Sequence, residues 1–288
     1  MASMREIKNR ITATQKTSQI TKAMNMVSAS KLRKAEKQYR AFTPTKDRIK
    51  TILEDILATY IDVTHPLLEP RDIKKTGYLL VTSDRGLAGP YNNNLLKQFK
   101  LHLREYHSKA DDYVIGTIGF KGYSYCKRNH LPLINSESIG SRDDLEFIDF
   151  QALSRAFITM YKTHQIDKLV VVYNHYVNTL TQTVQMETLL PITQLKKRKD
   201  VSVAEFLFEP SPQVVIDHLL PIFMENSLFG IILDAKTSEH AARMTAMKSA
   251  TDNAEEVMTK LNLYYNRARQ NAITKELTDI IGGANAVT

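Results

Sequence analysis

The spacing of apolar and small residues predicts a long helix at the N-terminal end of the chain. Such residues recur every three or four positions from Met4 to Phe42. The period resumes after Pro44, which we expect to kink or briefly stop the helix, and continues to about Ile61. This spacing lines one face of a helix. The main stripe contains Met4, Ile7, Ile11, Thr14, Ser18, Thr21, Asn25, Ser28, Leu32, Ala35, Tyr39 and Phe42, beside a stripe of Ile20, Met24 and Val27. Ser3 and Glu6 have the spacing of a capping box at its start.

The C-terminal end carries a second stripe, which consists mostly of alanine. No glycine or proline interrupts the 51 residues between Gly230 and Gly282, and these two residue types are the strongest interrupters of regular structure. The stripe contains Ala235, Ala242, Ala246, Ala250, Ala254, Val257, Leu261, Tyr264, Ala268 and Ala272. Each alanine lets a neighbouring helix approach closely but buries little apolar area, so the seam stabilises weakly per residue.

The length of this span decides how the helix fits the molecule. A helix of 51 residues is about 77 Å long, whereas a compact globule of 288 residues is roughly 50 Å across. We therefore expect the C-terminal helix to protrude from the globular part. Because both ends of the chain are helical, we expect them to pair as an antiparallel coiled coil.

The centre of the chain has the pattern of an α/β domain. Four runs rich in apolar or alternating residues predict strands, at 76–84, 112–119, 167–177 and 181–192. Two segments of helical period, 92–107 and 149–164, lie between them, with Asp149 placed to cap the second. Such alternation predicts a mainly parallel sheet covered by helices. We expect the coiled-coil helices at 1–61 and 210–288 and the α/β domain at 75–195.

Charge is concentrated at the N-terminal end. The whole chain has a net charge of +8, but residues 1–50 carry thirteen Lys and Arg against three acidic residues, a net charge of +10. This distribution indicates an acidic partner for the first helix. Charge alone leaves open whether that partner is nucleic acid, lipid or protein.

Export and membrane spanning are not indicated. The longest purely apolar run is about five residues, Leu169 to Tyr173, far below the roughly 20 residues that span a bilayer. The basic N-terminus lacks the apolar core of a signal peptide. The lone cysteine, Cys126, excludes an intrachain disulfide and fits a reducing compartment, and we expect it to be a buried or idle thiol.

Two glycine-containing segments are candidates for ligand binding. Gly116, Gly119 and Gly122 follow a predicted strand, but their spacing is not that of a dinucleotide-binding turn. The segment "SDRGLAG" (83–89) also follows a strand, where α/β proteins often bind ligands, but it lacks the Gly-Lys-Ser/Thr of a phosphate loop. We interpret both as structural turns, the second with Asp84 and Arg85 in local hydrogen bonds.

Metal and catalytic sites are not indicated either. Among the eight histidines only His102 and His107 lie close in sequence, and a five-residue step should place them on different faces of a helix. No local Ser/His/Asp grouping appears. The basic segment "QLKKRKD" (194–200) is read as a surface loop. We expect no catalytic residue, no cofactor and no metal.

Three segments resemble the gamma subunit of rotary F-type ATP synthases. They are "NRITATQKTSQITKAMNMVSASKLRKA" (9–35), "TSDRGLAGPYN" (82–92) and "SEHAARMTAMKSATDNAEEV…LNLYYNRARQNAITKELTDIIGGANA" (238–286). The resemblance runs the length of the chain in the family's order. It implies two long antiparallel helices attached to a central Rossmann-like α/β domain.

The resemblance also implies a function and partners. In this family the coiled coil is a rotor inside a ring of alpha and beta subunits, and the central domain lies against the epsilon subunit and the membrane c-ring. Ion flow turns the c-ring and the shaft, and the shaft drives the catalytic beta subunits. The resemblance therefore implies a subunit that is not itself an enzyme, with no nucleic-acid partner and no direct membrane insertion.

Six residues are assigned to the beta-subunit interface by motif match. Lys22, Met24 and Met26 in "TKAMNM" would face acidic loops of beta. Arg269, Gln270 and Thr274 in "ARQNAIT" would make polar contacts with beta. The tail "IIGGANAV" would reach an apolar bearing at the top of the ring.

The sequence also bears on the cellular location of the protein and on alternative functions. No cysteine-bearing insert interrupts the centre, which argues against the chloroplast form, and the motif begins too close to Met1 for a transit peptide. We therefore expect a bacterial protein, peripheral at the cytoplasmic face of the plasma membrane. The alternatives are a basic helical nucleic-acid-binding protein, whose affinity would fall steeply with salt, and an α/β enzyme that binds a nucleotide at "SDRGLAG".

Overall fold

The computed structural model describes residues 4–59, 64–140, 147–195, 209 and 211–285. The chain divides into two compact units, residues 1–28 with 244–288 and residues 29–243. We call the first the helix-pair unit and the second the central unit. Two helices, α1 (Met4–Thr59) and α5 (Pro212–Asn285), contribute residues to both units.

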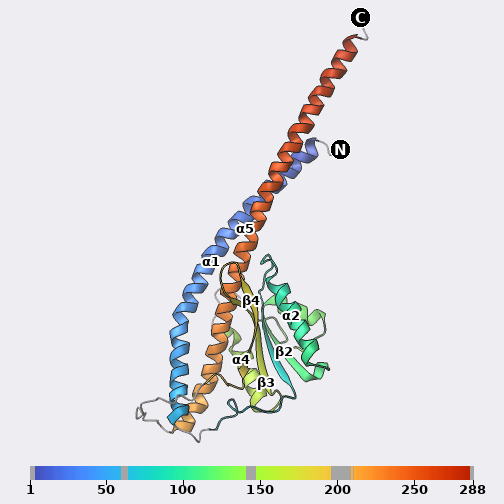
Figure 1. The fold of residues 1–288 in the computed structure, drawn as a ribbon. Helices are drawn as coiled ribbons and strands as arrows, with labels where there is room; N and C mark the ends of the chain where they lie inside the picture. Colours follow the sequence, from blue (N-terminus) through green and yellow to red (C-terminus); the bar gives the residue numbers. More distant parts are fainter. Residues whose placement is uncertain (1–3, 60–63, 141–146, 196–208, 210, 286–288) are drawn as a thin grey trace. The chain divides into compact units, whose positions relative to one another are not determined.

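A four-stranded sheet forms the middle of the central unit (Figure 1). Its strands are β1 (Thr76–Val81), β2 (Tyr113–Ile118), β3 (Lys168–Tyr176) and β4 (Gln182–Leu190), in the order β2-β1-β3-β4. β1 is parallel to both β2 and β3, and β4 is antiparallel to β3. The connection from β2 to β3 therefore passes over β1. The gap between the carboxyl ends of β1 and β3 is a topological switch point, the place where open α/β sheets bind ligands.

Helices cover both faces of this sheet. On one face lie α2 (Tyr91–Tyr106) and α3 (Phe120–Arg128), which bury Phe99 and Cys126 against Leu80 of β1. On the other face lie α4 (Phe147–Lys162) and the parts of α1 and α5 that belong to the central unit. Because side chains alternate along a strand, Leu79 points into the second layer while its neighbour Leu80 points into the first. Burial on both faces explains why β1 and β3 are almost continuously apolar.

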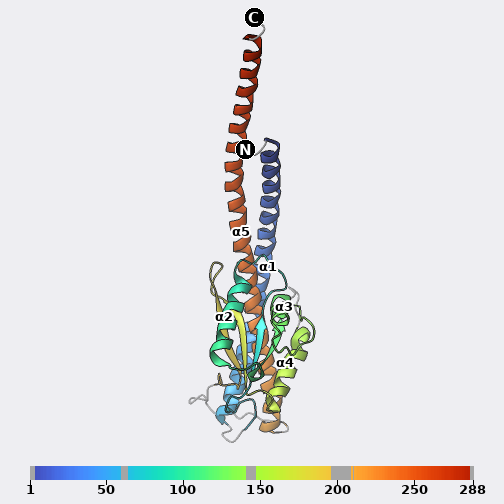
Figure 2. The same cartoon turned by 90° about the vertical axis from the view of Figure 1, so that its right-hand side faces the viewer.

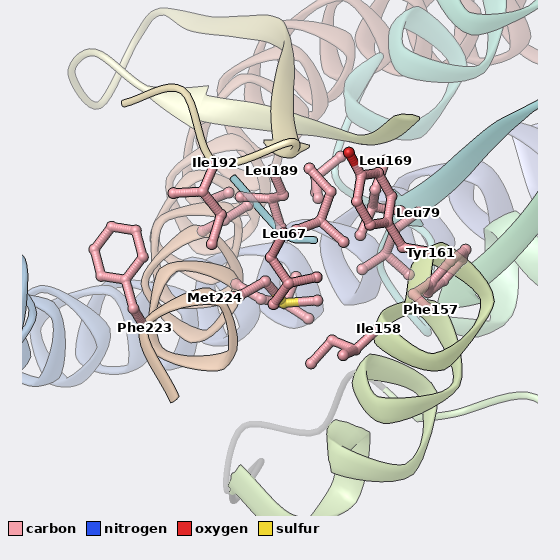
Figure 3. Close-up of a cluster of buried hydrophobic side chains, with 14 of the residues drawn as sticks. Leu67, Leu79, Phe157, Ile158, Tyr161, Leu169, Leu189, Ile192, Phe223 and Met224 are labelled. Carbon is pink, nitrogen blue, oxygen red and sulfur yellow. The ribbon is translucent and has the colours of Figure 1, made fainter. Parts of the chain in front are cut away.

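The larger core lies between the sheet, α4 and the beginning of α5. Figure 3 shows side chains from all three gathered in one cluster. The labelled members are Leu67, Leu79, Phe157, Ile158, Tyr161, Leu169, Leu189, Ile192, Phe223 and Met224. Phe157 is fully buried, and removing such a ring typically costs about 3–5 kcal/mol of stability. This core attaches α5 to the sheet.

The helix-pair unit consists of Met4–Ser28 of α1 and Met244–Asn285 of α5. Figure 2 shows the two side by side, with the end of α5 extending beyond the start of α1. These stretches are about 37 and 63 Å long at 1.5 Å per residue. The predicted antiparallel pairing of the chain ends is confirmed.

Most predicted elements are confirmed, and some details are wrong. All four strands and the helices at 92–107 and 149–164 are present. Asp149 does not cap α4, because the helix already begins at Phe147 and Asp149 lies in its first turn. The sequence reading missed α3, a nine-residue helix that follows Gly119 and contains Gly122.

The long helices tolerate their proline and glycine residues. α1 continues through Pro44, and α5 contains Pro221 and Gly230. Gly230 lies where α1 approaches closely, because a Cβ added there would be 3.5 Å from atoms of Phe42 and Lys46. The predicted capping box falls outside the described residues, because Ser3 is not among them.

Gly119 is the glycine whose conformation the fold requires most directly. Its φ is +95°, and an added Cβ would lie 2.1 Å from the carbonyl oxygen of Thr82. We predict that Gly119→Ala lowers the free energy of unfolding of the central unit by at least about 2 kcal/mol. Urea unfolding followed by tyrosine fluorescence measures this loss.

The matched control for this substitution is Gly86→Ala. An added Cβ at Gly86 meets nothing within 4 Å, and its φ is not in the left-handed range. We expect the control to unfold like the unmodified chain. Equal unfolding midpoints for the two variants would contradict the prediction.

Candidate functional site

Polar side chains join the two helices of the helix-pair unit. The hydroxyl groups of Thr21 and Thr251 are 2.7 Å apart, and both residues are buried. The side-chain amide of Asn25 donates to the carbonyl oxygen of Met244 at 2.7 Å. As the number rises from 21 to 25 on α1, the partner falls from 251 to 244 on α5, which fixes the antiparallel register.

The seam as a whole combines small residues with several larger apolar ones. On α1 its members are fully or partly buried, and on α5 alanines alternate with larger residues. These residues are Ile7, Ile11, Thr14, Ser18, Thr21, Asn25 and Ser28 on α1, and Met247, Ala250, Thr251, Ala254, Met258, Leu261, Tyr265, Ala268 and Ala272 on α5. The predicted seam of α1 is therefore confirmed in this unit, except that Met4 is exposed.

The predicted α5 seam is wrong at two positions. Val257 and Tyr264 are 45% and 56% exposed, and Met258 and Tyr265 take their places. The observed row of Thr251, Met258, Tyr265 and Ala272 repeats every seven residues, and the prediction placed two members of this row one residue too early. The neighbouring stripe on α1 also faces outward, since Ile20 and Val27 are 60% and 55% exposed.

The six residues assigned by motif match form two separate groups. Lys22 and Met26 are exposed and Met24 is partly buried, all next to the Thr21–Thr251 contact. Arg269, Gln270 and Thr274 are also exposed. Because Arg269 lies 18 residues beyond Thr251 on α5, the two groups are about 27 Å apart along the helix. They can contact partners, but they do not form one site.

An exposed apolar stripe at the end of α5 extends the predicted tail. Ile273, Leu277, Ile280 and Ile281 are all exposed and lie at helical spacing on one side. The motif-based prediction included only the last two, because Ile273 and Leu277 are separated by polar residues in the sequence. The side chains of residues 282–288 lie outside the described part of the chain.

In the central unit, α5 occupies the switch point of the sheet. Asp234 accepts two hydrogen bonds from the end of β3. One comes from His175 Nδ1 at 2.6 Å and the other from the Tyr176 amide at 2.9 Å. The hydroxyl of Tyr91, at the start of α2, donates to the carbonyl oxygen of Ala235 at 2.9 Å. Burial raises the pKa of Asp234, although the bonds from His175 and Tyr176 oppose this shift.

The "SDRGLAG" turn packs on the same helix. The Arg243 guanidinium lies 3.4 Å from the carbonyl oxygens of Arg85 and Gly86 and forms an ion pair with Glu239 at 2.8 Å. Within the turn, Asp84 accepts from the amide of Phe120 at 3.0 Å, and Ser83 donates to the carbonyl of Arg85 at 2.7 Å. The predicted local hydrogen bond is present at Arg85, whereas Asp84 bonds to a residue 36 positions away in sequence.

The glycine series after β2 is also structural. Besides the clash at Gly119, a Cβ on Gly116 would lie 2.7 Å from the ring of Phe157. The amide of Gly122 donates to Thr82 Oγ1 at 2.8 Å. These glycines allow α3, α4 and β1 to pack closely around the end of β2.

The prediction that His102 and His107 face different directions is wrong, because both rings approach the same hydroxyl group. The Nε2 atoms of both rings lie within hydrogen-bond distance of the Tyr78 hydroxyl, at 3.1 and 2.8 Å. They converge because α2 ends at Tyr106 and His107 is extended, with φ −131° and ψ 130°. Burial lowers the pKa of both histidines. In the described residues, no group of three or more His, Cys, Asp or Glu side chains is arranged to hold a metal ion.

One helix meets the length and composition test for a membrane span. Within Pro212–Thr278, an 18-residue window has a mean hydropathy of 1.4, and 56% of that window is buried inside the protein. Ile231 and Ile232 of this helix belong to the core of the central unit. An apolar helix buried in a protein core passes the same test, so the observation is weak support for a span.

We predict that the hydroxyl pair of the seam contributes little to stability. Thr21→Val combined with Thr251→Val replaces both partners with methyl groups of similar shape, which is typically neutral or stabilising. Tryptic cleavage after Lys16 and Lys22 in α1 should therefore be as slow as in the unmodified chain, or slower. The control, Thr17→Val, removes an exposed hydroxyl bonded to Ala13 and should have no effect. Much faster cleavage of the double variant would contradict this account.

We predict that the thiol of Cys126 is inert in the folded chain. The residue is fully buried, and burial raises its pKa to about 12. At pH 8 roughly one thiol in ten thousand is then ionised, and the thiolate is the reactive form. A disulfide-exchange reagent should label the chain only in urea, where the pKa returns to near 8.5. Stoichiometric labelling within minutes in native buffer would show the prediction to be wrong.

Comparison with known proteins identifies the family. A family model described as ATP synthase matches residues 3–287. The chain is also similar to a chain of the mitochondrial ATP synthase of Euglena gracilis, solved as OSCP, F1 and c-ring in rotational state 3. The identity is 18%, with 99% of this chain and 94% of that chain covered and a TM-score of 0.67.

Two further solved structures share this fold. One is the rotor of the Euglena gracilis mitochondrial ATP synthase in rotational state 1, with 18% identity, 94% of this chain and 98% of that chain covered and a TM-score of 0.61. The other is the central stalk and c-ring of the Tetrahymena thermophila mitochondrial ATP synthase, with 23% identity, coverage of 80% and 99%, and a TM-score of 0.60. These similarities show a common fold, and the family match covers almost every residue. The chain belongs to the gamma-subunit family of the F-type ATP synthases.

Proposed function

We propose that this chain is the central-stalk rotor that carries rotation of a c-ring to catalytic beta subunits. Residues 1–61 and 210–288 would supply the shaft and residues 75–195 the head. The observation that carries the proposal is the antiparallel pair of chain ends, joined by Thr21 and Thr251 along a seam of small residues. The hydroxyl and amide contacts of this seam are directional, so they hold the two helices in one register.

The proposed partners are the alpha and beta subunits, the epsilon subunit and the c-ring. The similar solved structures include a c-ring with a central stalk and an assembly with F1. The chain itself would catalyse nothing, which is supported by the use of its switch point to hold α5 rather than a substrate. It would be peripheral to the membrane, without inserting into it.

The cellular location remains a separate proposal. We propose the cytoplasmic face of a bacterial plasma membrane, although the similar structures described above come from mitochondrial enzymes. Membrane fractionation of the source cells, with release of the chain at low ionic strength, tests the peripheral attachment.

Reconstitution tests the function as a whole. The chain is mixed with alpha and beta subunits, and the purified product is assayed for subunit ratio and ATPase activity. We expect a complex with one copy of this chain per ring, and ATP hydrolysis that depends on it. Tight binding of nucleic acid by the chain alone, with no complex formed, would instead favour the basic nucleic-acid-binding alternative.

We predict that charge at Lys22 matters for the coupling of this complex. Lys22 is exposed beside the seam, and an acidic loop on beta would attract it through solvent. Lys22→Glu should lower the ATPase rate several-fold, and this loss should shrink as salt rises, because exposed charges are screened. The seam residues are untouched, so the helix pair should remain folded.

Lys16→Glu is the matched control for Lys22→Glu. Lys16 is also exposed on α1. It lies six residues before Lys22, a rotation of one full turn plus about 240°, so the two side chains point in different directions. Equal loss of activity in both variants, with the same salt dependence, would show that general charge rather than the Lys22 position matters. The corresponding substitutions at Arg269 and Gln270 test the second group.

A further inference from the structure

The segment of α5 from Ile231 to Ala242 differs from every other helical segment in the described chain, because all of its residues are buried. It includes Asp234, Lys236, Glu239 and His240, which a core helix would normally exclude. Burying such groups is costly unless they are paired. Their retention here requires partners, and the central unit provides them.

The strand end at His175 and the turn after β1 contact opposite sides of α5. The side chains of Asp234 and Arg243 are nine residues apart, which places them about 180° apart around the axis. Asp234 is held by the end of β3, through His175 and Tyr176. Arg243 is held by the turn after β1, at the carbonyl oxygens of Arg85 and Gly86. The sheet therefore holds α5 on both sides.

Between these two contacts lies a third, which acts on the helix backbone. The Tyr91 hydroxyl donates to the carbonyl oxygen of Ala235, and Tyr91 is itself fixed by the Asn174 amide at 3.2 Å from its carbonyl. Asn174 directly precedes His175 on β3. The strand end and the start of α2 are thus linked to each other as well as to α5.

Contacts on opposite sides of a helix resist its rotation about its own axis. At a radius of about 6 Å, a turn of about 20° would move the Asp234 carboxylate by roughly 2 Å. The bond to His175 is only 2.6 Å long, and hydrogen bonds weaken steeply with distance and angle. The interlocking apolar side chains of the core also resist rotation, and the polar contacts add resistance that depends on direction.

We infer that Asp234, held by His175 and Tyr176, is the positioning residue through which the central unit grips α5 when torque passes between them. With Tyr91 on Ala235 and Arg243 on the turn after β1, these residues form a clamp at the switch point of the sheet. The inference rests on the proposed function, because only a rotor carries torque along this helix. Replacing a residue that only stabilised the fold would impair rotation equally under small and large loads.

The test uses the complex with alpha and beta subunits and a load fixed to the central unit. Leu101, exposed on α2, is replaced by cysteine and biotinylated, while the buried Cys126 stays unlabelled. A small or a large bead is attached, and ATP-driven rotation is recorded together with ATPase activity. Torque produced at the helix pair reaches the central unit through α1 and α5, and the clamp holds the second of these helices.

We expect Asp234→Ala and His175→Ala to rotate the small bead like the unmodified complex. With the large bead, ATP hydrolysis should continue while rotation is lost, because α5 slips in the central unit. His175→Gln keeps an N–H donor for Asp234 and should restore loaded rotation. Tyr91→Phe removes only the bond to Ala235 and should give an intermediate loss.

Asp217→Ala is the matched control. Asp217 is on the same helix and also faces a histidine, His65, but at 4.0 Å and with a half-exposed side chain. It should turn both beads normally. His175→Ala leaves the sequence of α5 unchanged, so it decides the question if Asp234→Ala does not assemble.

The possible outcomes separate the two proposals. If the unmodified chain forms no complex and turns no bead, the proposed rotor function fails. If it turns both beads and the Asp234, His175 and Tyr91 variants do so equally well, the clamp is overturned while the rotor function stands.

Discussion

The attachment of α5 to the sheet, by an apolar core and by the hydrogen bonds of Asp234 to the end of β3, is the constraint on which the arrangement of the central unit depends. This attachment places α5 at the carboxyl ends of β1 and β3. The Tyr91 hydroxyl and the turn at Arg85 and Gly86 make further contacts with this helix, at Ala235 and Arg243. In this chain, helix α5 lies at the sheet position where other α/β proteins bind ligands.

The helix-pair unit is held together in a different way. Its seam combines hydroxyl groups, an amide and alanines with larger side chains such as Leu261 and Tyr265. Such a seam fixes the register of two helices without a strong apolar grip, since each small residue removes little apolar area from water. The central unit thus holds α5 by directional polar contacts, and the helix pair is joined by a narrow seam. Both features suit a rotor that transmits torque along these helices.

The sequence predicted what repeats locally and missed what depends on distant pairs. Apolar β-branched runs identified three strands and an alternating pattern identified the fourth, and the three-four spacing from Ile7 to Ser28 identified the α1 seam. The clamp was missed because His175 and Asp234 lie 59 residues apart and neither belongs to a motif. The convergence of His102 and His107 was missed because it requires α2 to end between them. Tyr264 and Tyr265 are adjacent and identical, so the residue types alone did not decide which of them lies in the seam.

Amide hydrogen exchange along α5 tests the central claim most directly, because it reports local opening residue by residue. If the clamp holds the helix, the amides of residues 231–242 should exchange most slowly and those of 244–261 faster. The amides beyond Ala272, which extend past the described start of α1, should exchange fastest. Uniform protection along the whole helix, or slowest exchange beyond residue 244, would contradict the account.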